Sequence, residues 1–340
     1  MDVPTTTSAA KVATAQAPLR MAAMGPQRQH APNSAAQGRA RYFNSANAFN
    51  IKLPAVPAQS FAAEAQRAMA ADMPTGYIAC DQSDAMGCEG PATTPLMLAR
   101  YARIAAGDSL PMRFPSSGTI CFVIAGSGAS DIAGIAGIAD IGDVATGETI
   151  AWSAGDVIFF PGGPAVTHRA ASEDAVLWLV SDEPLMAFDG LRAAPSPSAA
   201  AVHYPAVEIR RQLALLYDAV PEATTSGRAL IFSSDALEHT HNIHPLLTLS
   251  LNTLPPGDSQ PAHRHNSAAI TLIVDGDDCH SMVDGQAGPW QRWSTMVTPP
   301  GGAHSHHNGG DRRALFLIVQ DGGLHYRART MGFQSLPSAS

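Results

Sequence analysis

The chain has 340 residues, enough for two domains of ordinary size, each with its own core, and its 45% hydrophobic content predicts a globular protein. The net charge is −8 without a basic stripe, and no apolar run approaches the roughly 20 residues that cross a bilayer, so we expect neither a nucleic-acid nor a membrane partner. The cysteines show no CxxC spacing, which favours reduced thiols in a cytoplasmic protein: Cys80, Cys88, Cys121 and Cys279.

The first 75 residues differ in composition from the rest of the chain. Residues 1–40 are rich in Ala, Ser, Thr, Gln and Pro, with several basic residues but only one acid, Asp2. This composition predicts a disordered tail. An organellar transit peptide is the alternative, since such segments are also poor in acidic residues. Residues 41–75 are predicted to form an extended arm that lies on a folded domain or on a neighbouring subunit.

An internal repeat organises the remainder of the chain. Residues 107–126 (GDSLPMRFPSSGTICFVIAG) align without a gap with residues 257–276 (GDSQPAHRHNSAAITLIVDG), and residues 155–168 align with residues 293–306. Between these blocks the first copy carries an insertion, residues 130–141. Both copies consist of short runs rich in Val, Ile, Thr and Phe, bounded by Gly, Pro and Asp, which predicts two related β-barrels. We place them at residues 76–200 and 205–335, with helical patterns at residues 61–69 and 207–216.

Histidines are concentrated in the second copy, where ten of the thirteen fall between His239 and His325. Residues two apart in a strand share a face, so His263 and His265 are expected to point into the barrel. His304 follows a Pro-Pro-Gly-Gly turn, and a barrel can bring it opposite that strand. His306 would face the same interior. Thiolate ligands are missing from this group, which disfavours a structural zinc site.

These residues match two known motifs. The pattern G-x5-H-x-H with a glycine 11 residues later, followed by P-x-G-x-x-H, is similar to the two signature motifs of the cupin superfamily. The segments AHRHNSAAITLIVDG and VTPPGGAHSHHN resemble the gentisate 1,2-dioxygenase family, bicupins that cleave aromatic rings with non-haem Fe(II). The matching positions are Gly257, His263, His265, Gly276, Pro299, Gly301 and His304.

The resemblance implies an all-β fold of two tandem cupin barrels, each a double-stranded β-helix or jelly-roll, with few short helices. It implies that His263, His265 and His304 bind the metal, with Fe(II) expected and another divalent metal as the alternative. Most cupins add a Glu three or four residues after the second histidine, where this chain has Ala268 and Ala269. Three neutral imidazoles leave the metal's charge uncompensated, so an anionic chelating substrate can neutralise it.

Further positions bear on the substrate. The resemblance assigns His306 to substrate contact or proton transfer, which makes it the candidate catalytic residue. Thr271 stands where the family has an Arg directed at the substrate, and Ile318 stands near the place of a family Asp. His244 lies close enough in sequence to line the mouth of the barrel. Because Thr271 and Ile318 replace charged groups that could bind a hydroxylated benzoate, a substrate other than gentisate is favoured.

The first barrel lacks the corresponding ligands. Arg113, Pro115 and Val166 take the places of His263, His265 and His304, and His168 aligns with His306. One histidine cannot hold a metal ion, so the first barrel is expected to be structural or to bind something else. In the gentisate dioxygenases the metal usually lies in the N-terminal cupin, and this chain departs from that arrangement.

The leading hypothesis is a dioxygenase of aromatic compound catabolism that adds O2 to, and cleaves the ring of, a small hydroxy- or amino-substituted aromatic acid. The alternatives are a metal-dependent cupin lyase, isomerase or hydrolase without O2 chemistry, and a ligand-binding cupin. The expected partners are the small anionic aromatic substrate and O2. From the resemblance we also expect a homo-oligomer, a dimer or a tetramer.

Overall fold

The computed structural model describes residues 18–49, 51–134, 147–193, 200–220 and 227–337. The chain divides into two units, Met1–Leu53 and Pro54–Ser340. The described part of the first unit has only short, exposed elements, in which β1 pairs with β2: η1 (Met21–Ala23), β1 (Gln27–Arg28), α1 (Ala35–Arg39) and β2 (Arg41–Tyr42). Residues 1–17 of the predicted tail lie outside the described residues, and the division between units falls inside the predicted arm. Both assignments stay predictions.

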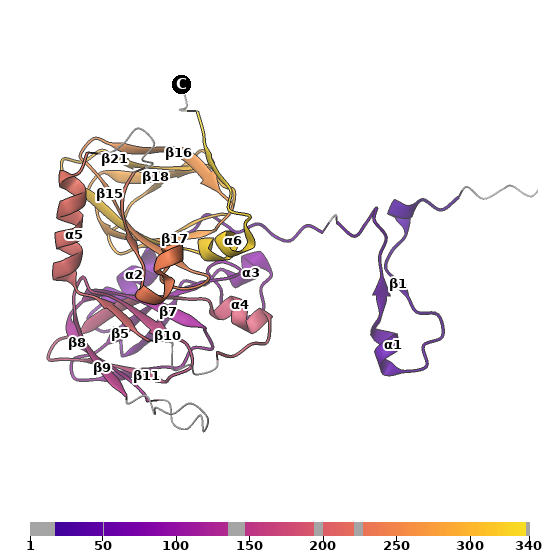
Figure 1. The fold of residues 1–340 in the computed structure, drawn as a ribbon, viewed down its shortest axis with the longest axis horizontal. Coiled ribbons are helices and arrows are strands. Elements are labelled where there is room, and N and C mark those ends of the chain that lie inside the picture. Colours follow the sequence, from indigo (N-terminus) through magenta and orange to yellow (C-terminus); the bar gives the residue numbers. More distant parts are fainter. Residues whose placement is uncertain (1–17, 50, 135–146, 194–199, 221–226, 338–340) are drawn as a thin grey trace, which may run out of the picture. The chain divides into compact units, whose positions relative to one another are not determined.

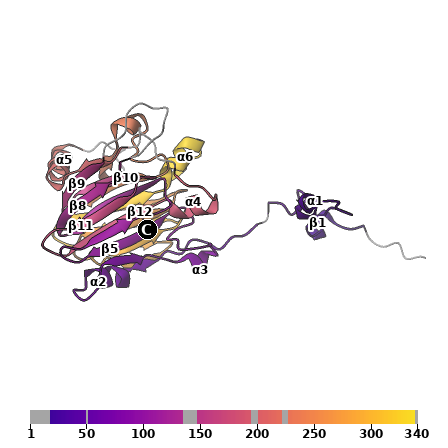
Figure 2. The same cartoon turned by 90° about the horizontal axis from the view of Figure 1, so that it is seen from below.

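The N-terminal barrel consists of two antiparallel sheets (Figure 1, magenta). The first has the order β13-β10-β7-β12-β5-β4 and the second β6-β11-β8-β9. Their strands are β4 (Gly76–Ala79), β5 (Leu98–Ile104), β6 (Ser109–Met112), β7 (Gly118–Ala125), β8 (Ser127–Ile132), β9 (Glu148–Ser153), β10 (Val157–Pro161), β11 (Val166–Ala170), β12 (Ala175–Ser181) and β13 (Val202–Tyr204). In Figure 2 the strands of this barrel run side by side, and α2 (Ala62–Met69) lies next to β5. The helices α3 (Ser83–Met86) and α4 (Glu183–Phe188) are short.

The C-terminal barrel repeats this plan (Figure 1, orange and yellow). Its sheets have the orders β14-β15-β22-β17-β20-β3 and β19-β18-β21-β16-β23. The strands are β3 (Ser60–Phe61), β14 (Arg228–Phe232), β15 (Thr248–Leu254), β16 (Ser259–His265), β17 (Ala269–Asp275), β18 (Cys279–Val283), β19 (Gln286–Pro289), β20 (Thr295–Thr298), β21 (His304–Asn308), β22 (Ala314–Gln320) and β23 (Phe333–Ser335), and the helices are α5 (Ala206–Asp218), η2 (Asp235–Thr240) and α6 (Gly322–Ala328).

The sheets confirm the predicted all-β fold of two tandem barrels with few short helices. The two predicted helical patterns correspond to α2 and α5. The predicted insertion begins within β8, and its residues 135–141 lie outside the described residues. None of the described helices has the length and apolar character that a membrane crossing requires.

The largest apolar core lies between the two six-stranded sheets. It joins residues of β5, β7 and β12 to residues of β15, β17 and β22, while each barrel has a smaller core inside it. Strands with one face in a barrel and the other in this shared core are buried throughout, as β5 and β12 are. The shared core includes Tyr101 and Trp178, whose polar atoms both reach Thr295 Oγ1, at 2.8 and 2.9 Å. Burial therefore leaves neither aromatic polar group unpaired.

A buried His–Ser–Trp unit occurs once in each barrel. In the first, His168 Nδ1 lies 2.7 Å from Ser130 Oγ, to which Trp152 Nε1 donates at 2.9 Å. In the second, Ser281 Oγ is paired in the same way with His306 Nδ1 and Trp290 Nε1, both at 2.8 Å. The structural repeat therefore extends beyond the aligned sequence blocks to the residues that hold each histidine ring.

His168 should make the protein sensitive to acid. Burial lowers the pKa of this imidazole to about 4, and its Nε2 atom meets no hydrogen-bond partner among the described residues. The unfolded chain binds a proton on this residue below about pH 6.5. Between pH 6.5 and pH 4 unfolding therefore takes up a proton, and this residue's contribution to stability is lost as the pH falls.

We predict that His168→Asn, which does not titrate, loses about 2 kcal/mol less unfolding free energy than the wild type between pH 7.5 and pH 5.0. Urea unfolding at the two pH values measures this difference. Equal losses in the two proteins would show that His168 is not a source of the acid sensitivity.

Candidate metal centre

Three histidines meet inside the C-terminal barrel. His263 and His265 lie on β16, and His304 begins the neighbouring strand β21, directly opposite His263 in the strand register. One ring nitrogen from each of the three lies within 4.8 Å of the others, and all three side chains are buried. The structure thus brings together the three residues that the sequence pattern predicts as ligands, on the two strands that the pattern implies.

Backbone carbonyls fix the protonation of each ring. The Nδ1 atoms of His263, His265 and His304 lie 2.8, 2.8 and 3.0 Å from the carbonyl oxygens of Pro261, Ser267 and Gly302. A carbonyl oxygen only accepts, so each Nδ1 carries the proton and each Nε2 keeps its lone pair. Metal-binding histidines typically have their second nitrogen held in this way.

The surroundings of His265 and His304 also favour neutral rings at these two positions. Burial lowers the pKa of His304 to about 3, and the two neighbouring imidazoles add to the effect. The pKa of His265 is lowered from the same first cause. Neutral rings are the form that binds a metal, since protonation would occupy the lone pair. Three neutral nitrogen donors without a thiolate fit a divalent transition-metal ion such as iron(II).

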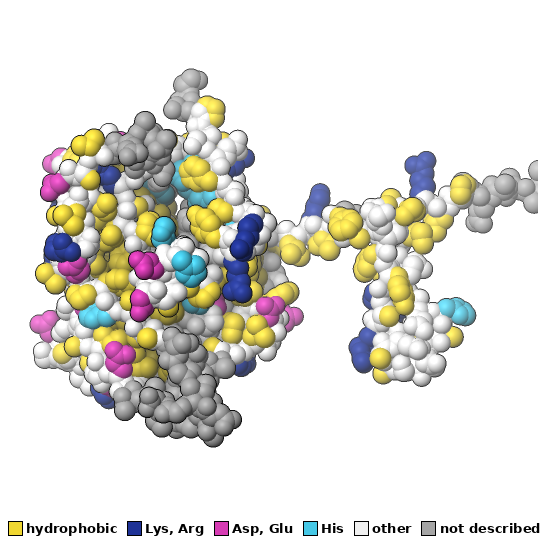
Figure 3. All heavy atoms as spheres, viewed as in Figure 1, with side chains coloured by type: hydrophobic (Ala, Val, Ile, Leu, Met, Phe, Trp, Pro, Cys, Tyr) yellow, Lys and Arg dark blue, Asp and Glu magenta, His cyan; other side chains and the backbone are white. Residues whose placement is uncertain are grey.

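A cavity of about 330 Å³ opens onto the three rings. In the space-filling view, several histidine side chains (cyan) are visible over the C-terminal barrel (Figure 3). No Lys, Arg, Asp or Glu is among the described residues that line the cavity, and its polar groups are amides, hydroxyls and imidazoles. One wall comes from the end of the chain, where β23 pairs with β16 and Phe333 stacks on His263 at 5.2 Å between ring centroids. An ion held by the histidines would therefore be the dominant charge in this cavity.

Two of the three residues predicted to contact substrate line this cavity. Thr271 does so from β17, and His306 does so from β21 with its Nδ1 atom paired to Ser281. Burial, followed by the neighbouring imidazoles, lowers the pKa of His306 well below its usual value. Sequence reasoning did not single out Gln320 or Phe333, which reach the cavity through strand pairing that no local motif signals.

His244 lies elsewhere, which corrects the expectation that it lines the mouth. The amides of Leu246 and Leu247 donate to its Nδ1 atom at 3.2 Å, so its Nε2 carries the proton and donates to Ser117 Oγ at 2.9 Å. Ser117 in turn donates to Asp182, in the N-terminal barrel. His244 therefore links the two barrels and does not line the described cavity. His244 is near the strands of the C-terminal barrel in sequence, but the chain passes between the barrels before β15 begins, so the side chain lies away from the cavity.

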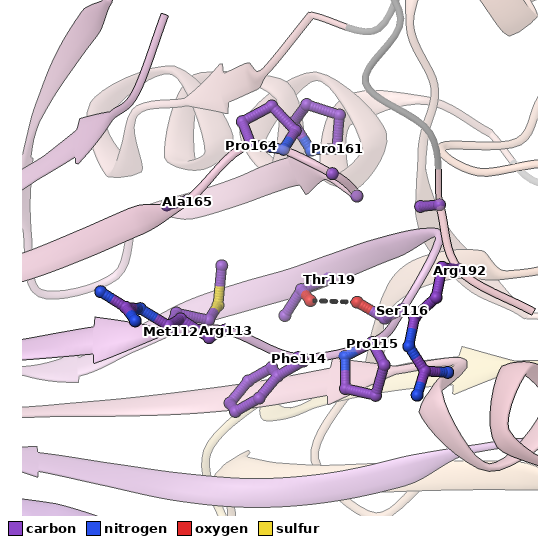
Figure 4. Close-up of a pocket in the computed structure, with 13 residues that line it drawn as sticks. Met112, Arg113, Phe114, Pro115, Ser116, Thr119, Pro161, Pro164, Ala165 and Arg192 are labelled. Carbon is purple, nitrogen blue, oxygen red and sulfur yellow. Dashed lines mark hydrogen bonds between the residues drawn. The ribbon is translucent and has the colours of Figure 1, made fainter. Parts of the chain in front are cut away.

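The N-terminal barrel has a cavity of about 460 Å³ without the three rings (Figure 4). Arg113 and Pro115 line it, at the positions that align with His263 and His265, and its hydroxyls belong to Ser116 and Thr119, which lie 3.3 Å apart. Val166, at the position of His304, is buried. Among the described residues, the cluster of the C-terminal barrel is the one group with three converging metal-ligand atoms.

Comparisons with known proteins agree with this geometry. Residues 250–320 match the cupin domain family model. A gentisate 1,2-dioxygenase from Ralstonia sp is 36% identical over 78 residues, 23% of this chain and 22% of that protein. A 1-hydroxy-2-naphthoate 1,2-dioxygenase from Nocardioides sp. (strain KP7) is 28% identical over 170 residues, 47% of this chain and 41% of that protein. The matches to these curated relatives thus span between about a fifth and two fifths of their length.

The crystal structure of a salicylate 1,2-dioxygenase from Pseudaminobacter salicylatoxidans shares the fold. It superimposes with a TM-score of 0.67 at 13% identity, over 84% of this chain and 90% of that one. Residues 250–320 therefore match the cupin domain family, the chain shares the fold of a salicylate 1,2-dioxygenase, and part of its sequence is similar to gentisate 1,2-dioxygenases.

Proposed function

We propose that this protein is a non-haem Fe(II)-dependent dioxygenase of the gentisate 1,2-dioxygenase-like class. It would add O2 to, and cleave the ring of, a small hydroxy- or amino-substituted aromatic acid. The observation that carries the proposal is the set of three buried Nε2 lone pairs, fixed by carbonyl contacts, which face a cavity with no charged side chain among its described lining. The similarity to named ring-cleaving dioxygenases supports it.

The residues of the chain have distinct parts in this function. His263, His265 and His304 would hold iron(II), which supplies positive charge for an anionic chelate and electrons for O2. The apolar side chains of Phe333 and Ile318 would flank an aromatic ring and exclude water. Cytoplasmic location and assembly into homodimers or homotetramers complete the proposal.

The lining of the cavity bears on the choice of substrate. Thr271 and Ile318 both lie in it, where the family would supply an Arg and an Asp. A cavity without an Arg has no fixed cation for a second anionic group away from the metal. We therefore propose a substrate whose carboxylate and adjacent hydroxyl or amino group both bind the metal. Gentisate also has this pair of donors, but we disfavour it because Thr271 and Ile318 replace charged groups that could hydrogen-bond the polar substituents of a hydroxylated benzoate.

We propose that His306 contacts the substrate or transfers a proton. Its ring lines the cavity through the edge that does not face Ser281, since Nδ1 is paired there. The equivalent His168 is held by the same Ser–Trp pair in a barrel without the three ligands. Holding the ring therefore does not require a metal, and the chemistry specific to His306 comes from the rings beside it.

The proposed function makes a prediction about metal content and O2 consumption. Purified protein should hold about one iron per chain and consume O2 with at least one hydroxy- or aminobenzoate, as measured by elemental analysis and an O2 electrode. His263→Ala removes one of three ligands and should lower both iron content and O2 consumption at least 10-fold.

The proposed function fails if the iron-loaded protein consumes no O2 with any of these acids. Full activity of His263→Ala would contradict the ligand assignment. Turnover that continues under strict anaerobiosis would instead support a metal-dependent lyase, isomerase or hydrolase, and release of a tightly bound acid unchanged would support a ligand-binding cupin.

A further prediction separates the chemical role of His306 from its role in folding. The amide of His306→Asn reaches the place of Nδ1 and can keep the contact with Ser281, while the Nε2 edge is lost. We expect iron content to be retained and kcat/KM for the best benzoate substrate to fall at least about 100-fold. His168→Asn is the matched control, since it makes the same change in the other barrel and should leave activity within about 3-fold. Equal effects of the two variants on activity would assign His306 to folding alone.

A further inference from the structure

Gln320 places an amide against the lone pair of His265. It is the last residue of β22 and is half-buried at the edge of the cavity. Its Nε2 atom lies 3.3 Å from His265 Nε2, and Ser267 Oγ lies 3.5 Å from its Oε1 atom. Because His265 Nδ1 donates to the Ser267 carbonyl, His265 Nε2 can only accept, so the Gln320 amide donates to it. The amide therefore lies at the edge of the ring at which a metal ion would bind.

The strand register explains how Gln320 reaches this place. Gln320 lies directly opposite Ala269, the first residue of β17. Ala269 is one of the two positions at which most cupins would have the Glu ligand. Alanine at this position has no polar atom to offer the cavity, and the neighbouring strand contributes an amide beside it. The polar group is thus contributed by β22 across the ladder.

The distance from the amide to the ring suits two donors of one ion. Atoms that each lie about 2.1 Å from a metal are separated by about 3.0 Å at a right angle and by about 3.4 Å at the tetrahedral angle. The 3.3 Å between the Gln320 amide and His265 Nε2 falls within this interval. The separation therefore allows both side chains to bind one ion, provided that the amide turns away from the axis of the His265 lone pair, which the ion would take.

Metal binding changes which end of the amide is favoured. Once an ion takes the lone pair of His265, the Gln320 N–H group loses its acceptor and would face a positive charge. Rotation of the amide by about 180° exchanges its nitrogen and oxygen, which have nearly the same shape. The nitrogen can then donate to Ser267 Oγ, which already accepts from His265 Nδ1 at 3.0 Å and has a second lone pair. Both ends of the amide remain hydrogen-bonded or coordinated.

We propose that Gln320 is a fourth, neutral donor of the metal centre, with its amide oxygen directed at the ion that His263, His265 and His304 hold. The proposal rests on the metal site of the proposed function, and it does not depend on O2 chemistry. A neutral donor fixes the ion without reducing its charge, so the full charge stays available to an anionic chelate. A carboxylate in the same place would hold the metal more tightly and weaken the binding of that anion.

Two variants with opposite expected effects test this proposal. Gln320→Leu removes the donor, and Gln320→Glu adds a charge at the same atom. We measure anaerobic Fe(II) affinity, and Ni(II) affinity as a redox-inert probe, by competition with a chelator. We expect Leu to weaken metal binding at least about 5-fold and Glu to strengthen it at least about 10-fold. Salicylate binding to the Ni(II)-loaded protein should weaken at least about 10-fold in Gln320→Glu, measured by calorimetry.

Gln260→Glu is the matched control. Gln260 lines the same cavity, and among the described residues its side chain forms no hydrogen bond with the three ligand rings. The same charge placed there should change metal affinity by less than about 3-fold. A general loss of stability cannot strengthen metal binding, so the opposite effects of the two Gln320 variants separate ligation from misfolding.

Wild-type metal affinity in Gln320→Leu, or equal strengthening by Glu at positions 320 and 260, would overturn the proposal. Failure of the Gln320 proposal can be told apart from failure of the proposed function, because the metal-affinity measurements use neither O2 nor turnover. A protein that binds Fe(II) with the expected variant pattern but consumes no O2 would refute the dioxygenase and keep the role of Gln320. If the protein is active on a benzoate but both Gln320 variants keep wild-type metal affinity, the dioxygenase would be supported and the role of Gln320 refuted.

Discussion

The candidate metal centre depends on three hydrogen bonds from imidazole Nδ1 atoms to backbone carbonyls. Each bond fixes a tautomer and a ring orientation, and together they direct the Nε2 lone pairs of His263, His265 and His304 toward one point. The acceptor carbonyls belong to β16, to the connection directly after it and to the turn before β21, so the backbone next to the ligands also orients them. Changes in this backbone would therefore disturb the ligand set even if all three side chains were kept.

The two barrels show which parts of this arrangement belong to the fold and which to the chemistry. The His–Ser–Trp unit occurs in both, in the same hydrogen-bonded form, and so serves to pack each barrel. Among the residues that the structure describes, the three converging candidate ligands occur in the C-terminal barrel alone. The shared core between the six-stranded sheets does not depend on whether a barrel has the three histidines, since it is built from the outer faces of the barrels. One barrel could thus lose or lack ligands without loss of the interface that joins the pair.

Sequence patterns were informative where function depends on local spacing. The two-residue period of a strand places His263 and His265 on one face, and the turn at 299–302 sets the start of the strand that bears His304. Gln320 and Phe333 depend on strand register, Gln320 opposite Ala269 and Phe333 opposite His265, which a single sequence does not encode in any short motif. His244 shows the converse error, because nearness along the chain does not imply nearness in space where a connection crosses between barrels.

A cavity with neutral walls shifts recognition onto the metal. An arginine recognises a carboxylate wherever it can form two hydrogen bonds, but a metal ion recognises the spacing of two donor atoms that chelate it. In the absence of charged side chains among the described lining, an acid that lacks the second donor would lose most of its attraction to the site. Selection would then follow the position of the hydroxyl or amino group relative to the carboxylate, while the remainder of the ring meets Phe333, Ile318 and other uncharged side chains that tolerate varied substituents. In the proposed centre, neutral donors and neutral walls would thus act together, since each would leave the charge of the ion to the substrate.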